Sequence, residues 1–171
     1  MSTGPGGLAS SIGSNQQAGD PTVELKSTIN GKSIAVGISD NDLLVDLLRD
    51  GLGLTGTKRS CEVEVCGACT VLVDGNPVSS CMLLASEIDG SSVVTIEGLR
   101  DTEFFRAAEE TFTRHAAVQC GFCTPGILLT LQAVAYREAS DNLDIKKELS
   151  GNLCRCTGYQ ALLAAATELL A

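Results

Sequence analysis

Short runs of apolar and β-branched residues mark the strands predicted for the first part of the chain. Residues 22–29 and 32–38 are two such runs, and they flank Asn30-Gly31, a pair that favours a two-residue type I′ turn. The sequence therefore predicts a β-hairpin at this point. The other predicted strands are a second hairpin of residues 70–74 and 78–81, around Asp74, Gly75 and Asn76, and a strand over residues 93–96.

One helix is predicted among these strands, over residues 42–50, where leucines recur at helical spacing. Ser39 or Asp40 is suited to cap its first turn, and Gly51 is suited to end it. Residues 55–69 have no periodicity but contain three cysteines. A hairpin, a helix and further strands together predict an α+β module of about 80 residues.

After Gly98 the pattern becomes helical, and four helices in about 70 residues predict a small bundle. Thr124 and Pro125 are typical of a helix start, because Thr can cap free amides and Pro loses no N–H needed by the helix. Thr157 and Gln160 match a capping box for the last helix. The predicted helices are 102–115, 124 to about 138, 143–149 and 157–170.

The predicted organisation is a disordered tail at residues 1–21, an α+β domain at 22–98 and a helical domain at 99–171. The first 19 residues carry no charged side chain and are rich in Gly, Ser and Gln. A secretory signal would need a basic segment and an apolar core. We therefore expect a cytoplasmic protein, in which stable disulfides are disfavoured.

Composition and charge exclude several classes of protein. The chain of 171 residues is 44% hydrophobic and 19% charged, which is typical of a globular protein. No apolar run approaches the roughly 18–20 residues that a membrane-spanning helix needs. The net charge is −9, and a chain this acidic would repel nucleic-acid phosphates. The eight cysteines remain to be explained.

Four of these cysteines form a first quartet with the spacing C-x4-C-x2-C-x11-C. The set is Cys61, Cys66, Cys69 and Cys81. Three thiols on one loop and a fourth from a nearby strand match the plant-type [2Fe–2S] pattern. Gly67, directly after Cys66, lets the backbone pass close to a cluster. A structural zinc site is the alternative, although zinc sites usually present two close CxxC-like pairs.

The other four form a second quartet with the pattern C-x2-C…C-x-C: Cys120, Cys123, Cys154 and Cys156. By spacing alone this set fits zinc or an iron–sulfur cluster. Both pairs precede predicted helices, whose N-terminal amides favour negative charge, and Arg155 adds positive charge between two ligands. A four-thiolate iron–sulfur cluster is strongly negative, so this setting favours a cluster.

Three motifs resemble the small iron–sulfur subunit of molybdenum hydroxylases, the xanthine oxidase family. They are CEVEVCGACTVLVDG at 61–75, QCGFCTPG at 119–126 and CRCTGY at 154–159, and the resemblance covers residues 22–170. It implies a β-grasp ferredoxin domain followed by a four-helix domain, each with one [2Fe–2S] cluster. The family usually has Gly at the positions of Ser60 and Glu64, so a stiffer and bulkier loop is expected around the first cluster.

The resemblance also implies partners and an order of carriers. In this family a large subunit holds molybdopterin and hydroxylates the substrate. Electrons then pass through the helical-domain cluster and the ferredoxin-domain cluster, usually to FAD on a third subunit. Gln119 and Cys156 match the family's pterin contacts. The substrate pocket lies on another chain; among the family's substrates we favour N-heterocycles or related aromatics, although no residue of this chain carries that choice.

Several other residues are expected to be structural. His115, the single histidine, is interpreted as a solvated residue at a helix end, and one histidine excludes a Rieske centre, which needs two. Lys58 and Arg59 precede Cys61 and could offset cluster charge or lie at the surface. Tyr159 is expected to pack between helices.

Three functions therefore compete. The first is an electron-transfer subunit of a molybdenum hydroxylase, with no catalysis by this chain alone. The second is a free-standing two-cluster ferredoxin that carries electrons between separate enzymes. The third is a zinc adaptor. The motifs QCGFCTPG and CRCTGY favour the first, because a simple ferredoxin would not need a pterin-facing domain.

Overall fold

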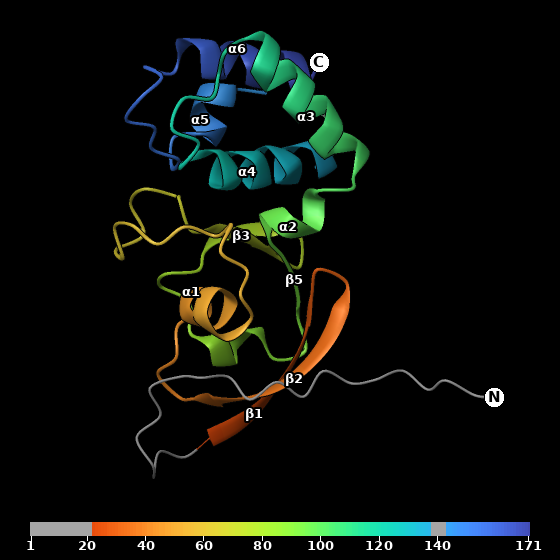
Figure 1. The fold of residues 1–171 in the computed structure, drawn as a ribbon, viewed down its shortest axis with the longest axis vertical. Helices are drawn as coiled ribbons and strands as arrows, with labels where there is room; N and C mark the ends of the chain where they lie inside the picture. The colour runs from red at the N-terminus through yellow and green to blue at the C-terminus, as the bar shows by residue number, and fades with distance from the viewer. Residues whose placement is uncertain (1–21, 138–142) are drawn as a thin grey trace, which may run out of the picture.

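The computed structural model describes residues 22–137 and 143–171. A sheet with one helix on its face forms the N-terminal half, and a group of helices forms the C-terminal half (Figure 1). The expected disorder of residues 1–21 lies outside the described residues. Within the described ranges, no helix is both long and apolar enough to cross a membrane.

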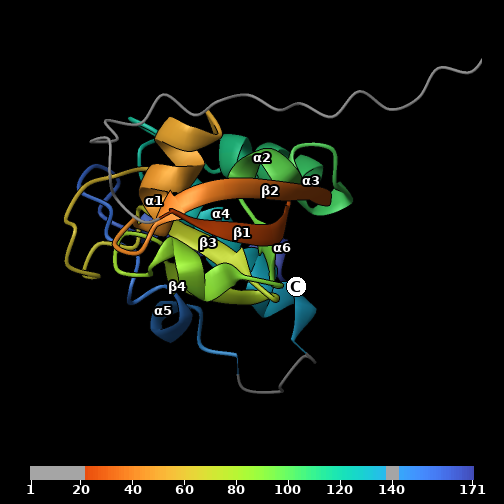
Figure 2. The same ribbon diagram turned by 90° about the horizontal axis from the view of Figure 1, so that it is seen from below.

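The sheet has five strands in the order β2-β1-β5-β3-β4, with β2 and β4 at opposite edges (Figure 2). It is mixed, because β1 pairs parallel with β5 while the other neighbours pair antiparallel. The predicted first hairpin is confirmed, since Asn30 and Gly31 both have positive φ, as a type I′ turn requires. The strands are β1 (Thr22–Ile29), β2 (Lys32–Ser39), β3 (Thr70–Val73), β4 (Asn76–Ser79) and β5 (Ser92–Val94).

The predicted helix after the first hairpin is present as α1 (Leu44–Asp46), which continues as a π-helical turn over Leu47–Gly51. Its predicted cap is wrong. The helix follows Leu43, and the Asp42 carboxylate accepts a 2.8 Å hydrogen bond from the Ser39 amide. The buried leucines of this helix pack against one face of the sheet, together with a 3-10 turn at Ala85–Ile88.

The C-terminal half contains the four predicted helices. Thr102 caps the first by accepting a hydrogen bond from the Phe105 amide. The second is buried along most of its length, because it lies between the other helices and the sheet. The helices are α3 (Glu103–Arg114), α4 (Thr124–Tyr136), α5 (Ile145–Glu148) and α6 (Gln160–Leu169), preceded by a short α2 (Ile96–Leu99).

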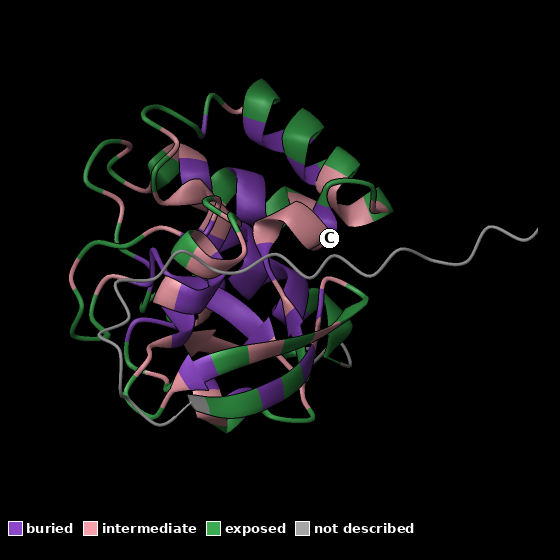
Figure 3. Cartoon of the chain, turned by 60° about the horizontal axis from the view of Figure 1, so that its bottom comes forward, coloured by how far each residue is buried: buried purple, intermediate pink, exposed green. Residues whose placement is uncertain are grey.

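Strand β3 joins the two halves because its successive side chains point to opposite faces. Val71 belongs to the core beneath α1, whereas Leu72 packs with Leu129 and Ala133 of α4. Figure 3 shows the buried residues running through the centre of the molecule. The α+β fold class, with a ferredoxin domain before a helical domain, is thus confirmed; the boundary between residues 98 and 99 stays a prediction.

Three local predictions differ from the structure. The second hairpin turns on Asp74 and Gly75, so β4 begins at Asn76, two residues before the predicted strand. Ile96 begins α2 and does not extend β5; the Glu97 carboxylate then accepts a 2.7 Å hydrogen bond from the Gly56 amide. Helix α4 begins at Thr124 itself, which therefore cannot serve as its cap.

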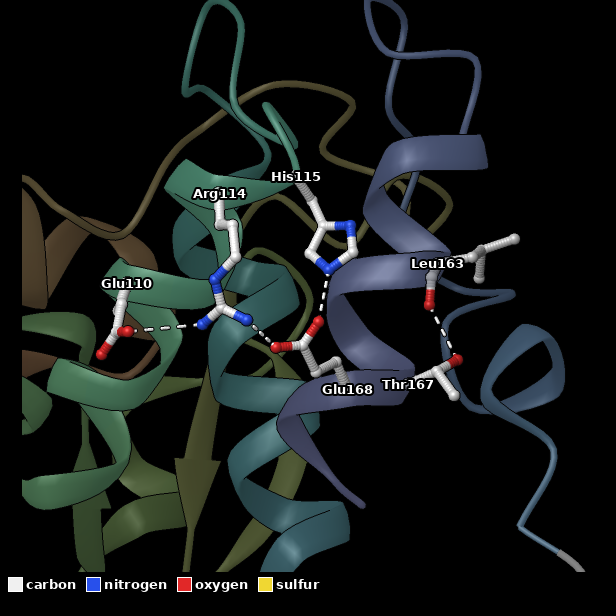
Figure 4. Close-up of polar contacts among 6 residues, drawn as sticks. All are labelled: Glu110, Arg114, His115, Leu163, Thr167 and Glu168. Carbon is white, nitrogen blue, oxygen red and sulfur yellow. Dashed lines mark hydrogen bonds and ion pairs between the residues drawn. The ribbon is translucent and has the colours of Figure 1, made fainter.

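His115 lies at the C-terminal end of α3, as predicted, and links this helix to α6. Its Nε2 lies 2.6 Å from a carboxylate oxygen of Glu168, and Arg114 forms an ion pair with the other oxygen (Figure 4). Arg114 also contacts Glu110. Hydrogen bonding to His115, together with Arg114, lowers the pKa of the Glu168 carboxyl. Exposed pairs of this kind stabilise a fold only slightly.

Candidate metal centres

The first quartet is gathered where the β3–β4 hairpin meets the long loop after α1. Cys69 immediately precedes β3, and Cys81 follows β4. The antiparallel pairing of Thr70 with Ser79 brings the two cysteines together, and the Ser80 hydroxyl donates a 2.7 Å hydrogen bond to the Cys69 carbonyl. Both thiols are buried beside Val45 of α1, so the hairpin supplies the inner half of the site.

The loop from Cys61 to Cys66 supplies the outer half. Val65 and Cys66 amides each donate a 3.4 Å hydrogen bond to the Cys61 sulfur. Hydrogen bonds from the Val63, Cys66 and Val65 amides lower the pKa of the Cys61 thiol to about 6. A loop whose amides point at sulfur stabilises a thiolate, which is the form that binds iron.

Glu64 is the position where the resemblance expects glycine, and it has a left-handed backbone with φ 57°. This conformation costs a residue with a side chain about 1–2 kcal/mol. It turns the Glu64 amide toward the Cys81 sulfur, where it opposes the effect of burial. Burial nevertheless raises the pKa of the Cys81 thiol to about 11. The loop thus keeps its ligand-facing amides without the glycine.

The second quartet lies at the end of the helical domain nearest the first. Cys123 immediately precedes α4, and Cys154 and Cys156 lie between α5 and α6. The Cys156 and Cys120 sulfurs are 3.4 Å apart, and both residues are exposed. This outer pair includes Cys120, which follows the exposed Gln119 directly, so Gln119 lies at the same open edge.

The inner pair of the second quartet has contrasting thiols. Burial raises the pKa of the Cys123 thiol to about 12. Burial also opposes ionisation of Cys154, but hydrogen bonds from Thr157 and the Cys156 amide outweigh it and lower the Cys154 pKa to about 7. The Thr157 hydroxyl donates to the Cys154 sulfur at 3.1 Å. The predicted capping box is therefore wrong, since α6 begins only at Gln160.

A cavity of about 430 Å³ opens between the two quartets. Ser60, Cys66 and Ala68 line one side, and residues of the second quartet, with Phe122 and Arg155, line the other. Among the described residues, no group of three or more His, Cys, Asp or Glu side chains is arranged to hold a single metal ion. A [2Fe–2S] cluster divides four thiolates between two irons, so its ligands need not meet at one point.

The cations near Cys61 are engaged elsewhere. Arg59 forms ion pairs with Asp46 and Glu62, and Lys58 donates a 2.9 Å hydrogen bond to the Thr55 carbonyl. These contacts agree with the interpretation of Lys58 and Arg59 as surface residues.

Sequence reasoning missed Asn152 and the hydroxyl of Tyr159. The buried Asn152 donates a 3.2 Å hydrogen bond to the Gly67 carbonyl beside the first quartet. The Tyr159 hydroxyl accepts a 2.7 Å hydrogen bond from the Cys154 amide and donates a 3.1 Å hydrogen bond to the Asn152 carbonyl. The one available signal was the position of Tyr159 within CRCTGY.

Two family models match the chain. The "2Fe-2S iron-sulfur cluster binding domain" matches residues 27–95, and the "[2Fe-2S] binding domain" matches residues 95–167. The matches meet at residue 95, where the sheet gives way to the helices.

Curated relatives match most of the chain. Caffeine dehydrogenase subunit gamma of Pseudomonas sp. (strain CBB1) is 44% identical over 142 residues, covering 81% of this chain and 85% of the relative. Nicotine 6-hydroxylase small subunit of Paenarthrobacter nicotinovorans is 43% identical, covering 85% and 88%. The xanthine dehydrogenase iron-sulfur-binding subunit of Escherichia coli O157:H7 is 39% identical, covering 83% and 91%.

Solved structures share the fold. A chain of quinoline 2-oxidoreductase from Pseudomonas putida 86 superposes with a TM-score of 0.79 at 44% identity, covering 86% of this chain and 91% of that one. Aldehyde oxidoreductase from Desulfovibrio gigas also gives a TM-score of 0.79, at 34% identity, but this chain spans only 17% of it.

Proposed function

Because this chain belongs to the small [2Fe–2S] subunits of the molybdenum hydroxylases, the xanthine dehydrogenase and aldehyde oxidoreductase family, we propose which residues hold each cluster and in which order electrons pass. The chain is an iron–sulfur electron-transfer subunit of a multi-subunit oxidoreductase and has two [2Fe–2S] binding domains. Cys61, Cys66, Cys69 and Cys81 hold the first cluster, and Cys120, Cys123, Cys154 and Cys156 hold the second.

The chemistry that two bound clusters supply is one-electron transfer, from molybdopterin on a large partner subunit to FAD or another acceptor on a further subunit. Amides around Cys61 and the Thr157 hydroxyl beside Cys154 stabilise thiolates in the two sites. Buried Cys69 and Cys81 keep water from the inner side of the first site. These different surroundings support different reduction potentials for the two sites.

The exposed edge of the second quartet is the observation that supports the order of carriers. Gln119, Cys120 and Cys156 are exposed there, so a partner's pterin can reach a ligand directly. The first quartet lies behind this edge, across the cavity between the two sites. Electrons that enter at Cys156 would therefore leave through the first quartet.

The substrate class we propose is an N-heterocycle. Relatives named for caffeine and nicotine are 43–44% identical to this chain, and the chain of quinoline 2-oxidoreductase is 44% identical. Aldehyde oxidoreductases match at 34–36%. The substrate is bound by another subunit, so this proposal rests on the sequence similarity between this chain and chains of complexes named for N-heterocycles.

Purification of the complete complex tests the proposal. We expect a large molybdenum subunit to copurify, two distinct [2Fe–2S] signals in low-temperature electron paramagnetic resonance of the reduced complex, and turnover of N-heterocycles in preference to aldehydes. A colourless chain containing zinc, or a red-brown chain that purifies alone without larger subunits, would overturn it in favour of an adaptor or a free ferredoxin.

A further inference from the structure

One short segment, Asn152–Cys154, touches both cysteine quartets. Cys154 belongs to the second quartet. The adjoining Leu153 amide donates a 2.9 Å hydrogen bond to the carbonyl of Cys66 in the first quartet. A continuous path of covalent bonds and one hydrogen bond therefore runs from Cys154 to Cys66.

The path is fixed because the backbones around it are in close contact. A Cβ on Gly67 would collide with the Gly151 carbonyl and would lie 2.6 Å from the Asn152 side-chain nitrogen. The Asn152 side chain also bonds the Gly67 carbonyl, so two hydrogen bonds and a glycine contact hold this segment against the first loop.

Tyr159 holds the segment from its other side. Its hydroxyl is bonded to the residues on both sides of Leu153, namely the Cys154 amide and the Asn152 carbonyl. Tyr159 itself has φ 67°, which is unusual for a bulky residue. Strain of this kind persists where surrounding contacts enforce it, and here the hydroxyl contacts link α6 to the segment.

We infer that Tyr159 is a positioning residue for electron transfer between the two clusters, and that the Leu153–Cys66 hydrogen bond is the route; this rests on the ligand assignment proposed above. The route carries one electron at a time, so the second cluster is oxidised as the first is reduced. No covalent bond is formed or broken, and no proton is transferred. Electronic coupling falls steeply when a hydrogen bond is replaced by a gap, so a small displacement of Leu153 matters.

The test is Tyr159→Phe in the complete complex, with Tyr136→Phe as the matched control. Tyr136 is 75% exposed at the end of α4, remote from the route. We expect Tyr159→Phe to retain iron, sulfide and the signal positions of both clusters. The magnetic interaction between the two reduced clusters should weaken, and rapid mixing should show transfer between them slowed on the order of 10-fold.

A second variant covers the case in which Tyr159→Phe loses a cluster or fails to fold. Asn152→Ala removes the bond to Gly67 but no contact to a sulfur, and it should weaken the same interaction with both clusters present. If both clusters are present and their interaction and transfer rate are unchanged in the variants, the inference is overturned while the ligand assignment stands. If the unsubstituted complex lacks either cluster, the proposed function itself fails.

Discussion

The carbonyl oxygen of Gly67 occupies the position that a Cβ on Gly126 would need. Gly67 follows Cys66 in the first loop, and Gly126 lies in the first turn of α4, three residues after Cys123. The two proposed cluster sites are therefore joined by direct backbone contact. A methyl group at either glycine would separate them.

Gly126→Ala should destabilise the protein by about 1–3 kcal/mol, as overpacking does when the neighbouring atom is backbone and cannot move aside. Chemical denaturation of the cluster-loaded chain measures this. Gly151→Ala is the matched control, because a Cβ built there meets no atom within 4 Å beyond its own chain neighbours. Equal loss in the two variants would contradict the proposed contact.

Cys66→Ser should remove the first cluster and leave the second. Iron content should fall by half, and one of the two electron paramagnetic resonance signals should remain. In the complex, substrate should still reduce molybdenum, while reduction of the final acceptor should stop. Rapid-mixing spectra with an unreduced molybdenum centre in an otherwise intact variant would show that the order of carriers is reversed.

Gln119→Ala should slow the departure of electrons from molybdenum without unfolding the chain. Gln119 is exposed beside Cys120, so the fold loses little, while one lost hydrogen bond to the pterin would cost about 0.5–1.5 kcal/mol. Stopped-flow reduction of the second cluster, together with thermal denaturation, separates the two effects. A structure of the complex with the first quartet nearer the pterin would refute the assignment.

The pKa of Cys61, lowered from 9.0 to about 6, predicts a pH dependence of alkylation in the iron-free, reduced chain. Labelling of Cys61 should rise roughly fourfold between about pH 5.5 and pH 7.5, because only the thiolate reacts. Cys81, with a pKa of about 11, should stay unlabelled throughout this range. Peptide mass spectrometry after brief exposure to iodoacetamide measures both, and similar rates at the two sites would refute the contrast.

The same shift has a consequence for stability. A thiol whose pKa is lowered by folding stabilises the fold above its ordinary pKa of 9.0, and this contribution is lost as pH falls through about 6. The iron-free chain should therefore lose part of its resistance to urea between these values. Replacement of Cys61 by Ala should remove that part of the pH dependence.

Features with a local cause were predictable from the sequence. Asn30-Gly31 determines its own turn, because only neighbouring residues take part. The cysteine spacings likewise predicted two quartets. The start of the strand after the turn of the second hairpin was misplaced by two residues, because Asp74 and Gly75 both adopt positive φ and close the hairpin without Asn76.

Features that depend on how the loops fold around the cysteines were not predictable. Thr157 matched a capping box, but its hydroxyl donates a hydrogen bond to the Cys154 sulfur. Tyr159 was expected only to pack between helices. Its hydroxyl reaches the Cys154 amide and the Asn152 carbonyl because of the way the chain folds back between α5 and α6. The hydrogen bond from Asn152 to Gly67 joins residues that are 85 positions apart, so no local sequence pattern predicts it.

The unequal burial of the cysteines bears on how the protein is assembled. Cys69 and Cys81 are buried beside Val45, whereas Cys120 and Cys156 are exposed. We expect a folded chain to receive iron and sulfide more readily at the exposed second site than at the first, whose Cys69 and Cys81 are buried. We therefore expect the molybdenum subunit to dock last, after the exposed second site has been filled. Premature docking would leave a chain without its second cluster, which time-resolved iron incorporation during assembly would reveal.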